Sequence, residues 1–129
     1  MLREYEFTLI LKPDLMEDNI KSLQNKYESL FVKDGGQIIK KENWGVRKLA
    51  FPVKKAYRGF YAIYDFVGKP EHLAEAERLM RFDESVLRYM SVRLGEDVDV
   101  EVRRVEIQKA DEKAREAERA EAARAKQQY

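Results

Sequence analysis

The centre of the chain, residues 42–53, reads Glu-Asn-Trp-Gly-Val-Arg-Lys-Leu-Ala-Phe-Pro-Val. This segment is apolar enough to form a β-strand, and it carries the only tryptophan, Trp44, and an internal glycine, Gly45. A glycine inside a strand favours a bulge or a bend. Pro52 cannot donate to a strand ladder, which indicates that this end of the strand lies at a sheet edge. We therefore expect a long edge strand over residues 37–53.

Positive charge is concentrated in and just after this strand. Between residues 37 and 58 there are seven lysines or arginines against one acid, whereas the whole chain of 129 residues has a formal net charge of +1. A basic, aromatic strand is typical of surfaces that hold a phosphate backbone or a partner. Lysines also protect edge strands from aggregation, so the cluster alone is only moderately specific.

The flanking patterns place this strand in a fold. Residues 4–11 alternate as a half-buried strand, and residues 15–33 have the period of an amphipathic helix that Asp14 is expected to cap. A turn at residues 54–58 leads to an apolar third strand, residues 59–67. Pro70 then opens a second helix, and residues 85–94 form a fourth strand. The order β-α-β-β-α-β predicts an α+β, ferredoxin-like fold, with a four-stranded antiparallel sheet, both helices on one face and the other face open.

The domain organisation follows from composition. We expect a ferredoxin-like domain over residues 1–95, which hold 17 basic and 14 acidic side chains. A charged C-terminal extension is expected over residues 96–129, which hold 8 basic and 10 acidic side chains. No apolar stripe remains after Ile107. We interpret residues 109–129 as a solvated helix or frayed tail, so that the extension is partly helical or disordered and able to order on a partner.

Several functional classes find no support in the sequence. There is no cysteine, and no dinucleotide-binding, Walker or nucleophile-elbow motif, so we expect neither an enzyme nor a cofactor or metal site. His72, the only histidine, reads as an exposed helix residue, and Glu4 and Glu6 as a solvated strand face. Residues 58–66 superficially resemble an RNP1 motif but lack its stacking aromatics. Without a signal-peptide core or a run of about 20 apolar residues, a cytoplasmic protein is expected.

The aromatic residues divide by strand parity. Phe60 and Tyr64 are expected in the core, and Tyr61 on the open face. There Tyr61 either stacks on a base or packs beneath the hairpin, and the sequence leaves both open. Three apolar residues of the strand over residues 37–53 are expected to shape it and to be buried: Trp44, Leu49 and Phe51.

Three arginines outside the basic cluster are further candidates for binding. Arg3 begins the first strand, and antiparallel pairing brings it near Arg93 on the fourth. Arg88 and Arg93 have opposite parity, so without a bulge they lie on opposite faces of the sheet. The sequence does not indicate which of the two faces a ligand.

Together these residues resemble the bacterial small-subunit ribosomal protein S-six (S6) family from residue 1 to about residue 95. The most specific block is residues 44–53, followed by Lys54-Lys55 and Gly59-Phe60-Tyr61; Arg3-Glu4-Tyr5-Glu6 and residues 85–89 also contribute. Phe51 departs from the family pattern, which more often has tyrosine there. The extension is not part of the pattern.

The resemblance implies a structural, cytoplasmic and ribosome-associated role in the small (30S) subunit. Members bind small-subunit (16S) rRNA together with ribosomal protein S-eighteen (S18) and support assembly of the central domain. Arg3, Arg47 and Arg88 match basic positions of the family, and Lys54 and Arg58 join them from charge alone as expected RNA or partner contacts. The alternative is a ferredoxin-like protein-interaction module that binds no RNA.

Overall fold

The computed structural model describes residues 2–127, which form two compact units, one up to Val98 and one from Asp99 onward. The first unit contains β1 (Arg3–Leu11), α1 (Glu17–Phe31), a 3₁₀ turn (Lys33–Gly35), β2 (Gln37–Val53), β3 (Ala56–Gly68), α2 (Pro70–Arg81) and β4 (Val86–Glu96). The strands pair in the order β2-β3-β1-β4, and every pairing is antiparallel. The predicted ferredoxin-like fold is confirmed, and β2 is an edge strand.

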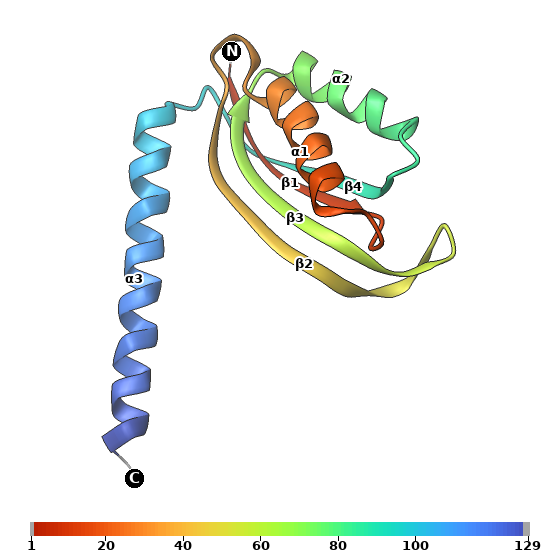
Figure 1. Ribbon diagram of the computed structural model, residues 1–129. Helices are drawn as coiled ribbons and strands as arrows, with labels where there is room; N and C mark the ends of the chain where they lie inside the picture. The colour runs from red at the N-terminus through yellow and green to blue at the C-terminus, as the bar shows by residue number, and fades with distance from the viewer. Residues whose placement is uncertain (1, 128–129) are drawn as a thin grey trace. The chain divides into compact units, whose positions relative to one another are not determined.

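Both helices of this unit pack on one face of the sheet (Figure 1). The period-two pattern of β1 sends Tyr5, Phe7, Leu9 and Leu11 into this core, where they meet apolar residues of α1 and α2. The ring of Phe31 stacks on that of a β3 phenylalanine with centroids 4.3 Å apart. Burial of these aromatic and aliphatic side chains is what holds the helices on the sheet.

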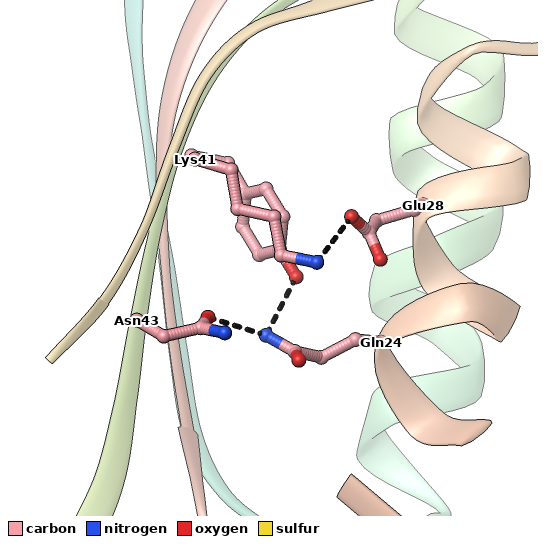
Figure 2. A network of polar contacts seen from close by, with 5 residues as sticks. Gln24, Glu28, Lys41 and Asn43 are labelled. Carbon is pink, nitrogen blue, oxygen red and sulfur yellow. Dashed lines mark hydrogen bonds and ion pairs between the residues drawn. The ribbon is translucent and has the colours of Figure 1, made fainter. Parts of the chain in front are cut away.

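A polar network joins the edge strand β2 to α1 (Figure 2). The amide nitrogen of Gln24, a side chain only 2% exposed, donates to Asn43 Oδ1 at 2.8 Å and to the hydroxyl of Tyr64 at 3.1 Å. Beside it, Lys41 Nζ lies 2.9 Å from a carboxylate oxygen of Glu28. Because a buried polar group without a partner is costly, this network favours one register of β2 against the helix.

The β2–β3 hairpin departs twice from regular pairing. The register shifts between Asn43 and Gly45, and Gly45 has a φ of +78°, which confirms the predicted bulge. A second shift falls between Lys48 and Val53. There Leu49 turns onto the sheet face opposite the helices and is buried against β1 and β4 residues. The face expected to be open is therefore partly covered at its hairpin end.

Two local expectations are wrong. Asp14 does not cap α1: the N-cap is Met16, which makes no side-chain cap hydrogen bond. The acids Glu17 and Asp18 occupy the first turn instead, where their negative charges interact favourably with the positive end of the helix dipole. Glu4 was expected to be solvated but is 2% exposed, whereas Glu6 is exposed as expected.

The second unit is the helix α3 (Val100–Gln127), 28 residues long. Asp99 begins it, with Oδ1 accepting hydrogen bonds from the backbone N–H groups of Glu101 and Val102. Its side chains are almost all exposed. Charged pairs such as Arg103 and Glu106, 2.8 Å apart, follow its surface. Among residues 2–127, no helix is long and apolar enough to span a bilayer.

Candidate nucleic-acid interface

The sheet face opposite the helices carries a small apolar cluster of its own. Ile10 of β1 lies opposite Tyr61 of β3 on one side and Arg88 of β4 on the other. Tyr61 is half-buried and packs against this cluster, which also contains Leu49. The predicted side of Tyr61 is confirmed, and its ring lies against hairpin residues.

A stack of rings and a guanidinium group extends this cluster toward the β2 edge. The ring of Trp44 stacks on that of Tyr61, with centroids 6.3 Å apart and planes 15° from parallel. The guanidinium carbon of Arg47 lies 5.3 Å from the centroid of Trp44, and its Nε donates to the Trp44 carbonyl at 3.4 Å. Trp44 is 47% exposed, so the expectation that it is buried is wrong. An exposed aromatic plane beside arginine suits stacking on bases.

The opposite end of the cluster has the same chemistry. The guanidinium carbon of Arg88 lies 5.7 Å from the ring centroid of Phe51. Phe51 is 59% exposed and was also wrongly expected to be buried; of the three residues expected to bury the strand, only Leu49 does so. A hollow of about 200 Å³ between Tyr61 and Arg88 separates the two ends. The sheet face thus presents two exposed arginine–aromatic pairs with a recess between them.

Arg88 and Arg93 lie on opposite faces of the sheet, as predicted. In β4, Arg88 pairs in register with Ile10 and Arg93 with Tyr5, and no register shift falls between these pairs. Arg93 therefore shares the parity of the helix-covered face, and its guanidinium is 2.9 Å from Glu96. Arg88 has no acidic partner among residues 2–127 and lies on the face with the exposed rings.

The other three predicted basic residues have separate surroundings. Arg3 is half-buried and lies 3.8 Å from Glu96. Its position in β1 places it on the face of the sheet that the helices cover. Lys54, in the hairpin turn, donates from Nζ to the backbone carbonyl of Val86 at 2.9 Å. Arg58 is exposed and directly opposite another cation, Lys48. The structure therefore groups Arg47 and Arg88 with Tyr61, and does not group Arg3 with them.

The β4 edge adds an apolar strip on the same face. Met90 and Val92 follow Arg88 at every second residue, and both are about half exposed. They pair in register with Thr8 and Glu6 of β1, which lie on the same face of the sheet as Ile10. Exposed apolar residues in a row, next to basic ones, are typical of a surface that docks a protein.

His72 is not the isolated, exposed residue that the sequence indicated. Its Nε2 lies 2.7 Å from Asp34 Oδ2, so α2 is linked to the turn that follows α1. The hydrogen bond with His72 lowers the pKa of the Asp34 carboxyl below its ordinary value. No group of three or more metal-ligating side chains occurs in the described part of the chain. This pair links two elements, with His72 mostly buried and Asp34 more than half exposed, and it lies away from the ring stacks.

Two features of this surface were not found from the sequence. One is the exposure of the two rings on β2, which follows from the bulges that rotate this strand. The other is Arg81, the last residue of α2, which lines a groove with Lys54 and Arg88. Its signal in the sequence was weak, because it is one of several charged residues on an amphipathic helix.

The fold and this surface define a class: a ferredoxin-like domain with an arginine- and aromatic-bearing sheet face. Comparison with known proteins identifies the family, because residues 4–93 match the model of ribosomal protein S6. The chain belongs to the ribosomal protein S6 family. This makes it a protein of the small ribosomal subunit, cytoplasmic and ribosome-associated, in a family of structural proteins and not of enzymes.

Individual relatives agree with this membership. The small ribosomal subunit protein bS6 of Geobacter metallireducens is 41% identical over 97 residues, which is 75% of this chain and 82% of that protein. The bS6 protein of Desulfatibacillum aliphaticivorans is 38% identical over 109 residues, which are 84% of this chain. The match spans only 59% of that relative's length. The crystal structure of 30S ribosomal protein S6 from Thermotoga maritima superposes with a TM-score of 0.67 at 25% identity, covering 89% of this chain and 99% of that one.

Proposed function

We propose that this chain binds small-subunit (16S) rRNA together with ribosomal protein S18 and supports assembly of the central domain. The observation that carries this proposal is the pairing of exposed rings with guanidinium groups on the sheet face: Arg47 with Trp44, and Arg88 with Phe51. Arginine suits phosphate because its planar fork donates two parallel hydrogen bonds, and aromatic planes stack on bases without sequence preference.

The arrangement of charge supports a nucleic-acid ligand. Lys48 and Arg58 are directly opposite each other on β2 and β3, and neither has an acidic partner among residues 2–127. Like charges in directly opposite positions are destabilising in a sheet. Such a pair is relieved when phosphate groups lie over it, which makes binding steeply dependent on salt.

The apolar strip of β4 supports a protein partner beside the RNA. Met90 and Val92 offer half-exposed side chains with the same parity as Arg88. An apolar strip bordered by arginine provides what a docked protein needs, a dry centre and a polar rim. We assign this strip to S18 and the ring–arginine pairs to rRNA.

The test is a gel shift with 16S rRNA, carried out with and without purified S18. Arg88→Ala is expected to weaken binding about five- to tenfold and to reduce the slope of log K against log salt by about one. Arg93→Ala is the matched control, because it removes the same charge from the same strand but on the opposite face. Equal effects of the two substitutions would show that the site is wrongly placed.

The same experiment separates the alternative function. A ferredoxin-like protein-interaction module would bind S18 or another protein through the β4 strip and show no RNA shift at any salt concentration. In that case Met90→Lys abolishes the interaction with the protein, and Arg88→Ala leaves it unchanged.

A further inference from the structure

A groove between the hairpin turn and the end of α2 gathers three cations from three separate segments. Lys54 comes from the turn between β2 and β3, Arg81 is the last residue of α2, and Arg88 lies on β4. The groove has a volume of about 270 Å³, and its remaining lining is Met80, Val86, Leu87 and Tyr89. No acidic side chain of the described part of the chain lines it.

The charges of this groove are not neutralised within the chain. Neither Arg81 nor Arg88 has an acidic partner among residues 2–127, whereas Arg78, one turn earlier on α2, lies 2.8 Å from Glu75 and donates two hydrogen bonds to it. Of the two acids that follow α2, Asp83 accepts hydrogen bonds from the Tyr27 hydroxyl at 2.6 Å and from a backbone N–H, and Glu84 is exposed outside the groove.

Contacts within the chain position Lys54 and Arg88 and leave some of their N–H donors for a ligand. One N–H of the Lys54 ammonium is used by the Val86 carbonyl at 2.9 Å, which leaves two of its three donors free. The guanidinium group of Arg88 lies over the face of Phe51, and this contact leaves its N–H groups free to donate. Arg81 lies at the negative end of the helix dipole, which stabilises its charge there.

We infer that the groove of Lys54, Arg81 and Arg88 is a binding site for one phosphate group, and that its ligand is a phosphodiester of the RNA backbone. A concave surface lined by cations without countercharge concentrates anions, and guanidinium groups bind phosphate through paired N–H donors. That the phosphate belongs to RNA rests on the proposed function. The anion site itself does not, because it follows from charge and geometry alone.

The site adds Arg81 to the residues that contact RNA, and it gives Lys54 a second role. The ammonium group that closes the hairpin turn onto β4 also faces the anion. The RNA strand would then pass from the ring-bearing sheet face, through Arg88, to the end of α2. Arg88 belongs to both surfaces, so the two are continuous.

The experiment compares Arg81→Gln with Arg78→Gln, which removes the same charge from the same helix. In the first arm, NMR titration of the full chain with inorganic phosphate at low salt is expected to shift the Arg81 and Arg88 side-chain N–H signals saturably. The Arg78 signals should hardly move. Arg81→Gln should weaken phosphate binding at least threefold, and Arg78→Gln should leave it unchanged. Absence of saturable shifts at Arg81 and Arg88 would overturn the anion site.

The second arm measures binding to 16S rRNA with S18 present. Arg81→Gln is expected to weaken it about three- to tenfold and to lower the salt slope by about one, with less than a twofold change for Arg78→Gln. Phosphate binding without this RNA effect would overturn the RNA ligand while the anion site stands. Competition for the groove by an acidic peptide but not by RNA would identify a protein ligand instead. Failure of the unsubstituted chain to bind rRNA would refute the proposed function and the RNA ligand. The titration with phosphate would still decide whether the groove binds an anion.

Discussion

Replacing Gln24 with leucine removes the side chain that joins β2 to α1 while keeping almost the same volume. Gln24 and Tyr64 are 2% and 1% exposed, so the Tyr64 hydroxyl loses a donor in a place that water hardly reaches. Leaving a buried polar group without its partner costs about 1–3 kcal/mol. Asn43 is exposed and can turn its amide to water, so it adds little. We expect a loss of about 2 kcal/mol in the free energy of unfolding.

For a domain of this size, that loss corresponds to a decrease of roughly 10 °C in Tm. Thermal and urea unfolding, followed by far-UV circular dichroism and by the fluorescence of the single tryptophan, measure it. Asn25→Leu is the control, because Asn25 is the exposed neighbour on α1 and should change stability by less than about 0.5 kcal/mol. Adding Tyr64→Phe to Gln24→Leu removes both members of the hydrogen bond and should recover part of the loss. Equal stability of the two leucine variants, or no recovery in the double variant, would refute the role given to the network.

Three further predictions concern stability and ionisation. Gly36→Ala should destabilise the fold by about 2 kcal/mol or more in urea unfolding, because a Cβ there would lie 2.3 Å from a backbone carbonyl oxygen of α1; unchanged stability would contradict the close approach. Burial raises the pKa of Tyr27 and of Tyr64, so their contribution to the free energy of unfolding is complete below about pH 10 and is lost as pH rises above it. The free energy of unfolding in urea should therefore fall between pH 8 and 11.5, and Tyr27→Phe should make this fall shallower. The same dependence on pH in both proteins would count against this. The hydrogen bond with His72 lowers the pKa of Asp34, so the stability that this pair gives the fold is present above the ordinary aspartate pKa and is lost as pH falls below it. His72→Phe should raise the Asp34 pKa in an NMR titration, and an unchanged pKa would contradict the pairing.

The order of elements was predictable because each has a strong local pattern. Period two in β1, the helical period of α1 and proline at the start of α2 depend only on neighbouring residues. The edge position of β2 followed from Pro52, and the bulge followed from Gly45. The opposite faces of Arg88 and Arg93 followed from counting residues along a regular strand.

The errors arose where a residue's surroundings depend on distant parts of the chain. The exposure of Trp44 and Phe51 depends on how the bulges rotate β2, and periodicity alone does not give that rotation. Glu4 is buried although its spacing matched that of a solvent-facing residue, and His72 has a partner 38 positions away. Asp14 fitted a capping pattern, but the helix begins after Met16.

The candidate site was predictable in kind but not in membership. Local charge pointed to the hairpin, and the family resemblance pointed to Arg47 and Arg88. The structure places Arg47 and Arg88 beside the exposed rings, and it gives Lys54 and Arg58 separate surroundings. Arg81 went unnoticed because α2 contains several charged residues, and only the fold shows which of them lacks an acidic partner. Arg3 was selected because it matches a basic position of the family, and in the structure its guanidinium group lies 3.8 Å from Glu96.

Whether the ring-bearing face contacts RNA is tested directly by ultraviolet crosslinking of this chain within assembled small subunits, with the joined peptides identified by mass spectrometry. We expect RNA crosslinks at Trp44, Tyr61 or Phe51 and on the segment that contains Arg88, and protein crosslinks to S18 along β4. RNA crosslinks confined to the outer surfaces of α1 and α2, with none on the ring-bearing face, would contradict it.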